Sequence, residues 1–261
     1  LTRSLIREGV EVDFALPGVQ IMEAFNALYD EPSLRLVLVR HEQSAAYMAD
    51  GYARTTGKPG VAMVVPGPGA LNATAALGTA FASSSPVMLI SGQIESYNLG
   101  AKRGALHEIG EQLDVFKHLT KWCERSVDSS EIPTMVHRAF QQLTTGRPRP
   151  VEIEIPWNIL PDQSNIELLE REVHPKIRPE PSDVKSAANA LAHAERPLIW
   201  IGGGAREANL SPELLELAQA LNAPVITTPE GKGAFPDNNI LSLGTIYNGH
   251  GPGHHLSLIH I

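Results

Sequence analysis

Short apolar runs alternate with longer amphipathic stretches along most of the chain. The runs that predict strands cover residues 12–16, 34–40, 60–66, 86–92 and 150–156. The stretches between them have helical periodicity, as in the alanine-rich residues 41–57, which end at a glycine. Strands that alternate with helices in this way form βαβ units. The pattern therefore predicts an α/β fold with a doubly wound, mostly parallel sheet.

Two stretches depart from this simple alternation. Residues 34–40 are almost continuously apolar, which is typical of a strand that is covered on both faces. Residues 93–118 carry Gly, Glu, His and Arg without clear periodicity, so we expect a long loop there. Long loops in compact domains often serve a function.

A polar, proline-containing stretch separates two parts of the chain. We predict a first domain over residues 1–162, a linker over 163–181 and a second α/β domain over 182–261. The second part contains only about two βα units before residue 261, so we expect an incomplete, Rossmann-like central domain.

Composition excludes several classes of protein. The 261 residues include 29 acidic and 21 basic side chains, and no basic cluster suggests nucleic-acid binding. No apolar run approaches the roughly 20 residues that a membrane span needs, and the first residues lack a signal core. Cys123 is the single cysteine, so neither an internal disulfide nor a CxxC metal clip is expected. We expect a cytoplasmic protein without its own metal-ligand set.

Candidate chemistry lies where predicted strands give way to helices. Glu42 follows the strand over 34–40, and ligands of open α/β sheets bind at this end of the strands. A carboxyl group there can exchange protons with a ligand. The alternative is that Glu42 has no such role and is only a glutamate stabilised by the dipole at a helix N-terminus. The turn over residues 66–72 contains Gly67, Gly69 and Asn72, and either brings backbone N–H groups close to a ligand or is an ordinary tight turn.

Two further signals are weaker. Gly202, Gly203 and Gly204 follow a predicted strand and form a candidate nucleotide loop. His107 lies in the long loop, where it is either a surface histidine or a functional one.

Taken together, these segments resemble the thiamine-diphosphate-dependent enzymes of the acetolactate synthase-like superfamily. The block RHEQSAAYMADGYARTTGKPG (40–60) is the specific part of the resemblance, whereas the glycine turns alone would not be. The other matching segments are FALPG (14–18), GPGALNA (67–73), PVMLISGQ (86–93), PVEIEIPWNI (150–159), IGGGA (201–205) and TTPEGKGAFP (227–236). The resemblance implies that the first domain binds the aminopyrimidine ring of thiamine diphosphate.

The resemblance also implies roles for particular residues. Glu42 corresponds to the glutamate that hydrogen-bonds the pyrimidine ring nitrogen and activates the cofactor. The remaining implied contacts are Pro17 and Gly18 beside the reacting centre, Gly67, Gly69 and Asn72 near the pyrimidine, and Gln93 near the mouth of the site.

Two features depart from the family pattern. Leu106-His107-Glu108 stands where acetolactate synthases have Phe-Gln-Glu, so His107 is expected to handle protons on the substrate side. The third domain, which holds Mg²⁺ and the diphosphate in the family, has no counterpart here. We therefore expect a fragment that is inactive alone. The complete protein would be a homodimer or homotetramer, and FAD binding by its central domain stays open.

The implied activity is that of a carboligase or lyase, a transferase or lyase on 2-keto acids or aldehydes. One alternative is an NAD- or FAD-binding oxidoreductase that uses the turn over 67–72, although Asn72 occupies the third glycine position of that fingerprint. A non-catalytic half-protein of the same fold is the other alternative.

Overall fold

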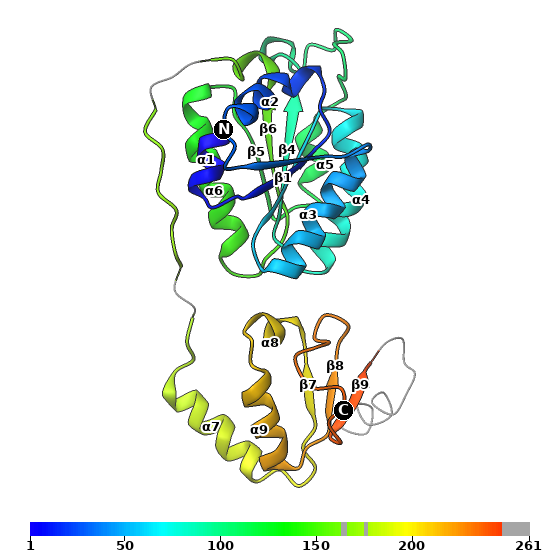
Figure 1. Cartoon of the computed structure of the whole chain (residues 1–261), viewed down its shortest axis with the longest axis vertical. Helices are drawn as coiled ribbons and strands as arrows, with labels where there is room; N and C mark the ends of the chain where they lie inside the picture. The colour runs from blue at the N-terminus through cyan, green and yellow to red at the C-terminus, as the bar shows by residue number, and fades with distance from the viewer. Residues whose placement is uncertain (163–165, 175–176, 247–261) are drawn as a thin grey trace. The chain divides into compact units, whose positions relative to one another are not determined.

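Six parallel strands form the sheet of the first part of the chain (Figure 1). The computed structural model describes residues 1–162, 166–174 and 177–246. Hydrogen bonding gives the order β2-β1-β3-β4-β6-β5, and all neighbours are parallel. The strands are β1 (Val12–Ala15), β2 (Arg35–Leu38), β3 (Gly60–Val64), β4 (Val87–Gln93), β5 (Trp122–Arg125) and β6 (Val151–Pro156). The predicted α/β fold with a parallel sheet is confirmed.

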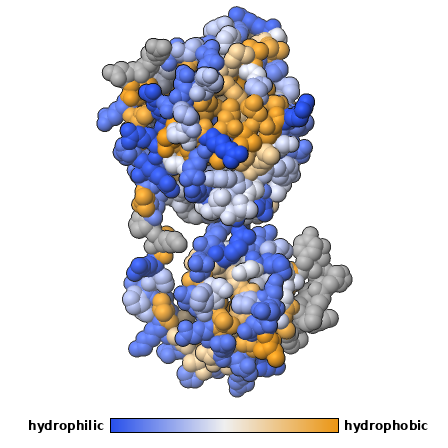
Figure 2. Space-filling model, in the orientation of Figure 1, coloured by the Kyte–Doolittle hydropathy of each residue, from blue (hydrophilic) through white to orange (hydrophobic). Residues whose placement is uncertain are grey.

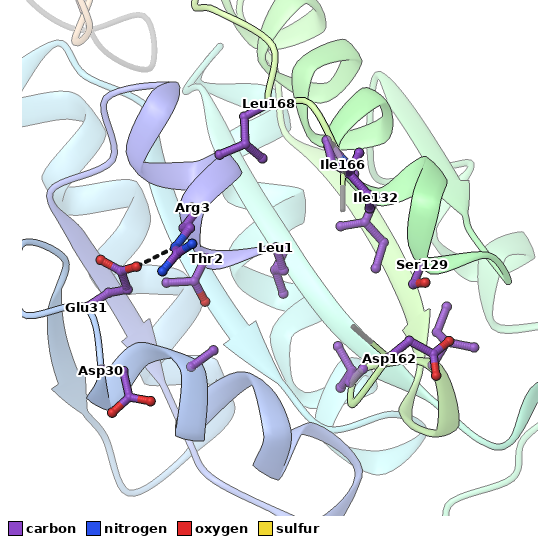
Figure 3. Close-up of a pocket in the computed structure, with 14 residues that line it drawn as sticks. Leu1, Thr2, Arg3, Asp30, Glu31, Ser129, Ile132, Asp162, Ile166 and Leu168 are labelled. Atoms are coloured by element: carbon purple, nitrogen blue, oxygen red, sulfur yellow. Dashed lines mark hydrogen bonds and ion pairs between the residues drawn. The ribbon is translucent and has the colours of Figure 1, made fainter. Parts of the chain in front are cut away.

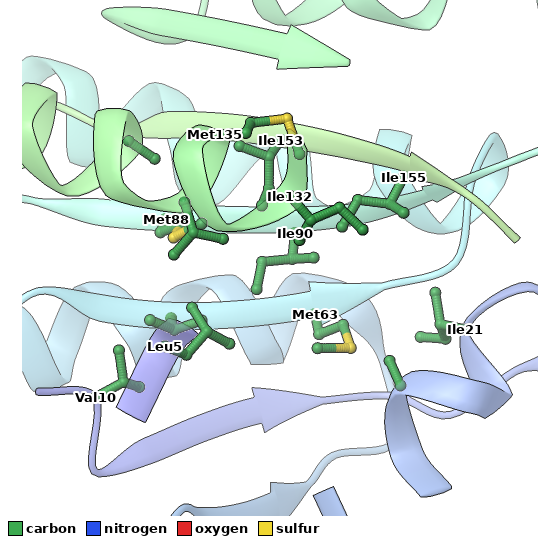
Figure 4. Packing of buried hydrophobic residues seen from close by; sticks show 14 of the residues in the cluster. Leu5, Val10, Ile21, Met63, Met88, Ile90, Ile132, Met135, Ile153 and Ile155 are labelled. Atoms are coloured by element: carbon green, nitrogen blue, oxygen red, sulfur yellow. The ribbon is translucent and has the colours of Figure 1, made fainter. Parts of the chain in front are cut away.

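Helices cover both faces of this sheet. On one face lie α1 (Thr2–Arg7), α2 (Met22–Tyr29) and α6 (Ile132–Thr144), and on the other lie α3 (Glu42–Thr56), α4 (Pro68–Ala82) and α5 (Gln112–Phe116). Short 3-10 turns complete the unit: η1 (Val19–Ile21), η2 (Ser96–Asn98), η3 (Ser129–Glu131) and η4 (Trp157–Ile159). In Figure 4, Leu5 and Met135 reach the sheet from α1 and α6. Each face therefore has its own apolar core.

Alanines let α3 and α4 lie close to the sheet. Ala45, Ala49, Ala73 and Ala76 are all buried, with at most 1% of their surface exposed. A Cβ at Gly60 would lie 2.0 Å from the carbonyl oxygen of Ala49, so β3 and α3 touch through their backbones. The Gly60 contact therefore sets the distance between α3 and β3.

The strand within residues 34–40 differs from its prediction. It was expected to be covered on both faces, but β2 is an edge strand, and Leu38 is 60% exposed. The apolar run reports a local preference for strand, while the position of a strand in the sheet depends on its neighbours. The expectation of full burial is therefore wrong.

Among the α-helices and strands of the first unit, three short ones were not predicted. They are α1, β5 and α5, the last of which ends the expected loop over residues 93–118. All four residues of β5 are half-buried and show no alternation, so the apolar pattern carries no strand signal there.

A second unit follows, and the chain divides into residues 1–175 and 176–261. Its three-stranded parallel sheet has the order β7-β8-β9. The elements are α7 (Pro181–Ala192), β7 (Ile199–Ile201), α8 (Gly203–Glu207), α9 (Ser211–Leu221), β8 (Val225–Thr227) and β9 (Ser242–Thr245).

The extended residues 166–174 contact the first unit, where Arg7 Nη1 donates to Glu170 Oε1 at 2.5 Å. The predicted limits at 162 and 182 stay predictions.

Asp13 is a fully buried carboxyl group on β1. Burial raises its pKa from 3.8 to about 7, against a smaller opposing effect of the Phe14 backbone. Because the folded pKa exceeds the unfolded one, the folded state keeps its proton where the unfolded state has lost it. Stability from this group is complete below pH 4 and is lost as the pH rises to about 7.

We expect the free energy of unfolding to fall by about 4 kcal/mol between pH 4 and 8 through Asp13 alone. Asp13→Asn removes this slope and makes the protein more stable than the wild type at pH 8. Urea unfolding followed from pH 4 to 8 measures the effect, with the exposed Asp30→Asn as the control. Parallel curves for the wild type and Asp13→Asn would contradict it.

Candidate functional site

Glu42 is the first residue of α3, directly after the loop that leaves β2. His41 caps this helix, because its Nδ1 accepts a hydrogen bond from the Gln43 backbone N–H at 3.1 Å. The Glu42 side chain is only 9% exposed. Its carboxylate therefore lies in a largely dry place at the carboxyl edge of the sheet, where the helix N-terminus favours negative charge.

Asn72 and Gly69 of α4 complete the surroundings of this carboxylate. Asn72 Nδ2 donates to Glu42 Oε2 at 3.0 Å. A Cβ at Gly69 would lie 2.5 Å from Val65 Cγ2 and 3.3 Å from Glu42 Oε1. The missing side chain at Gly69 thus lets the α4 turn pack against Val65 beside Oε1, while the Asn72 amide fixes the other oxygen. The structure brings these three predicted residues together.

Val65 also contributes to the site, and the sequence analysis did not identify it. A Cβ at Gly18 would lie 2.3 Å from Val65 Cγ1, so Gly18 and Gly69 both pack against this one side chain. Pro17, one residue earlier, is exposed. The loop after β1 is thereby held beside the α4 turn, although nothing in the local sequence indicates a contact with Val65.

Gly67 packs against the backbone of His107. Its φ is +56°, and a Cβ at Gly67 would lie 2.2 Å from the His107 carbonyl oxygen. His107 itself has a φ of +67°, which is uncommon for a residue with a side chain. Its Nδ1 is buried and has no hydrogen-bond partner in the described part of the chain. The predicted turn and the predicted loop histidine are therefore neighbours.

Gln93 ends β4 and is buried in a polar cluster with β5 and β6. Its Oε1 accepts from the Ile94 N–H at 2.8 Å, and its Nε2 donates to Glu154 Oε1 at 3.2 Å. Arg125 Nε donates to Glu154 Oε2 at 2.7 Å, and the same guanidinium pairs with Glu111. Burial raises the pKa of Glu154, and Arg125 opposes this rise. Both ends of the Gln93 amide are thus engaged inside the protein, and its role near a substrate stays a prediction.

Glu152 extends this cluster deeper into the sheet. Ser91 Oγ donates to Glu152 Oε1 at 2.6 Å. Burial, followed by the nearby charge of Glu154, raises the pKa of Glu152 well above its usual range.

Two buried glutamines also went unnoticed in the sequence. Gln112 is fully buried, and its Oε1 accepts from the Gly67 N–H at 2.7 Å. Gln20 is 3% exposed, and its Nε2 donates to the Leu106 carbonyl oxygen at 3.1 Å. A glutamine next to an apolar residue in the sequence is also common at protein surfaces, so nothing in the sequence indicated that Gln112 and Gln20 are buried.

The glycines of the second unit form a separate candidate. Gly202 is the N-cap of α8, and Gly203 and Gly204 belong to the helix itself. A Cβ at Gly203 would lie 3.2 Å from Glu230 Cβ, so this turn packs on the loop after β8. Its role as a nucleotide loop stays a prediction.

A cavity of about 570 Å³ lies elsewhere in the first unit (Figure 3). Residues of α1, α2, α6 and the chain after β6 line it, among them Leu1, Glu31, Ile132 and Leu168. None of the predicted site residues contributes to this lining. The cavity is therefore distinct from the Glu42 site.

Comparison with known proteins identifies the group to which the site belongs. The descriptions "Thiamine pyrophosphate enzyme, N-terminal TPP binding domain" and "Thiamine pyrophosphate enzyme, central domain" match residues 1–116 and 184–255. The chain belongs to the thiamine pyrophosphate enzyme family. The resemblance to its acetolactate synthase-like members is confirmed, because curated relatives of that name align along nearly the whole chain.

Three relatives illustrate the similarity. The chain is 38% identical to a probable acetolactate synthase large subunit of Methanocaldococcus jannaschii, over 94% of this chain and 42% of that protein. It is 35% identical to the acetolactate synthase isozyme 3 large subunit of Escherichia coli, over 94% and 43%. It is 37% identical to a probable 2-ketoarginine decarboxylase of Pseudomonas aeruginosa, over 94% and 44%. The chain thus spans less than half the length of these relatives.

The α4 turn is poorly suited to a nucleotide phosphate. A dinucleotide fingerprint needs free backbone N–H groups at the glycine turn. The Gly67 N–H is already bonded to Gln112 Oε1 at 2.7 Å. This observation disfavours the oxidoreductase alternative.

We expect Gly67→Ala to destabilise the first unit by about 2–4 kcal/mol, because the new Cβ meets the His107 carbonyl and φ is positive. Gly78→Ala is the matched control within the same helix, since nothing lies within 4 Å of a Cβ there. That change should stabilise by roughly 0.5–1 kcal/mol through helix propensity. Urea unfolding of both variants measures the difference, and equal midpoints would refute the close contact.

Proposed function

We propose that the protein containing this chain is a thiamine-diphosphate-dependent carboligase or lyase that acts on 2-keto acids or aldehydes. Family membership supports the cofactor, and the names of the relatives include both acetolactate synthase and 2-ketoarginine decarboxylase. The first name describes a synthase, and the second describes the decarboxylation of a 2-keto compound. The choice between joining and cleaving carbon–carbon bonds belongs to this proposal.

The observation that carries the proposal is the Glu42 carboxylate beside the glycine-lined α4 turn. One of its oxygens is fixed by Asn72 at 3.0 Å, and the other lies beside Gly69, which presents backbone and no side chain. A planar heteroaromatic edge fits a carboxyl group placed beside a backbone without side chains. The residues therefore fit an aminopyrimidine ring, which Gly18, Gly67 and Gly69 would border together with Pro17.

Thiamine diphosphate, when bound, supplies the electron sink for chemistry next to a carbonyl group. Glu42 would hold a proton at a ring nitrogen of the pyrimidine and exchange it during turnover. Asn72 would keep the carboxylate oriented through its amide N–H. The dry surroundings of Glu42 strengthen such a hydrogen bond, because few waters compete for it.

His107 is proposed to handle protons on the substrate side of the site. Its buried, unpartnered Nδ1 within the described chain gives the imidazole an unmet hydrogen-bonding capacity. An imidazole both donates and accepts protons near neutral pH. Gln93 is proposed to border the same side, although its amide is held by Glu154 and Ile94.

The remaining parts of the proposal concern the complete protein. In the described ranges, no group of three or more His, Cys, Asp or Glu side chains could hold a metal ion. We propose that Mg²⁺ is held outside these ranges, and FAD at Gly202–Gly204 stays a prediction. No helix in the described part of the chain is long and apolar enough to cross a membrane.

Self-association is also proposed. Tyr47, Met48 and Leu71 are exposed on α3 and α4, the two helices that carry Glu42 and Asn72. Figure 2 shows apolar residues gathered on one face of the first unit. A homodimer or homotetramer would cover such surface.

We expect Glu42→Gln to lower turnover of 2-keto acids by about 10²–10⁴-fold, because the amide keeps a hydrogen bond but cannot transfer the proton. Glu216→Gln, on an exposed position of α9, is the matched control and should retain full activity. The assay measures product formation from pyruvate by the complete protein with thiamine diphosphate and Mg²⁺. Full turnover by Glu42→Gln would remove the assigned role. Failure of the wild type to bind thiamine diphosphate would favour the non-catalytic alternative.

We expect His107→Gln to change the pH profile of turnover or the ratio of decarboxylated to ligated product. Glutamine keeps hydrogen bonding but does not titrate, so a proton-handling role is lost while packing is largely kept. The measurement compares product ratios and rates between pH 6 and 8. An unchanged ratio together with an unchanged profile would exclude the role.

A further inference from the structure

The Gln112 side chain forms hydrogen bonds with three groups at the carboxyl edge of the sheet, two of the backbone and one of a side chain. Its Oε1 accepts from the Gly67 N–H at 2.7 Å, while its Nε2 donates to Ser91 Oγ at 3.0 Å and to the Gly92 carbonyl at 3.3 Å. The carbonyl of Gly92 can only accept, and the N–H of Gly67 can only donate. The two ends of the amide are therefore unambiguous.

The Gln112 amide holds the turn at Gly67 from one side, and the His107 loop packs closely against the other side of this turn. Gly67 lies so close to His107 that a Cβ would stand 2.2 Å from the His107 carbonyl oxygen. A shift of the turn toward the loop would bring Gly67 into steric conflict with the His107 carbonyl, and a shift away would leave a gap between the two backbones. Gln112 thus determines the spacing between the start of α4 and the loop.

Gln20 holds the same loop from a second direction. Its Nε2 bonds the Leu106 carbonyl at 3.1 Å, one residue before His107. His107 keeps a φ of +67° between these two attachments. A non-glycine residue persists in this conformation when its surroundings over-determine it.

We propose that Gln112 is a positioning residue, which fixes the α4 turn so that Gly69 and Asn72 border Glu42 while the His107 backbone packs against Gly67. This inference rests on the proposed function for its catalytic meaning. Gln112 itself touches neither Glu42 nor His107 through its side-chain hydrogen bonds, and it acts through Gly67. A glutamine suits this place because it supplies one acceptor and two donors without burying a charge.

Removal of the amide should loosen the turn without unfolding the unit. In Gln112→Met, the Gly67 N–H has no acceptor from residue 112, so its hydrogen exchange should accelerate by at least about 10-fold. Gln112→Glu keeps an acceptor for this N–H and loses the donors, so exchange should lie between that of the wild type and Gln112→Met. Gln20→Met should accelerate exchange around residues 106–108 and leave Gly67 protected.

The experiment measures hydrogen exchange at Gly67 and at residues 105–109 in the full protein, together with its dissociation constant for thiamine diphosphate in the presence of Mg²⁺. Gln142→Met on α6 is the control of the same chemical type and should match the wild type. We expect Gln112→Met to weaken cofactor binding about 10-fold, with partial recovery in Gln112→Glu.

Three outcomes would overturn the inference. Unchanged exchange at Gly67 in Gln112→Met would show that the amide does not hold the turn. Faster exchange throughout residues 1–162 would show a role in global stability only. Local loosening with wild-type cofactor affinity would show that the turn position does not matter to the site. If the wild type binds no thiamine diphosphate, the proposed function fails, and exchange at Gly67 still decides whether Gln112 holds the turn.

Discussion

The contact between the α4 turn and the loop that carries His107 constrains the whole carboxyl edge of the sheet. No side chain fits between Gly67 and the His107 carbonyl, and none fits between Val65 and Gly18 or Gly69. These positions are filled by backbone packed on backbone or on one valine. Such packing transmits displacements, because protein interiors are nearly incompressible. The alanine-rich contacts of α3 and α4 with the sheet extend the same rigidity to the position of Glu42.

The polar groups behind this edge differ in how they are stabilised. Arg125 and Glu154 form a buried ion pair, whose attraction must offset the loss of hydration of both charges. Gln112 and Gln20 use neutral amides that bond backbone groups and Ser91 instead, so the burial of these two side chains costs less and does not change with pH. The α4 turn and the His107 loop are thus held by neutral hydrogen bonds. The charged pair lies further along the sheet, between β5 and β6.

Parallel topology explains why residues from four loops meet. The segments after β1, β2, β3 and β4 all leave the sheet at its carboxyl edge, and they supply Gly18, Glu42, Gly67 and the His107 loop in turn. Membership of the thiamine pyrophosphate enzyme family gives this convergence a chemical meaning. The relatives share the first and central domains that this chain contains, and they extend to more than twice its aligned length.

The sequence by itself determined the class of fold and indicated several candidate site residues. Whether a segment forms a strand or a helix depends largely on residues close to it in the sequence, so the alternation of apolar and amphipathic stretches predicted the parallel sheet. The block around Glu42 indicated the family. Tertiary structure alone decided the rest. It placed the apolar run over 34–40 on a sheet edge and joined Glu42 to Asn72 across 30 residues. It also joined Gly67 to Gln112 across 45 residues. Local pattern reports whether a segment prefers burial, but which distant group it meets depends on strand order and helix packing.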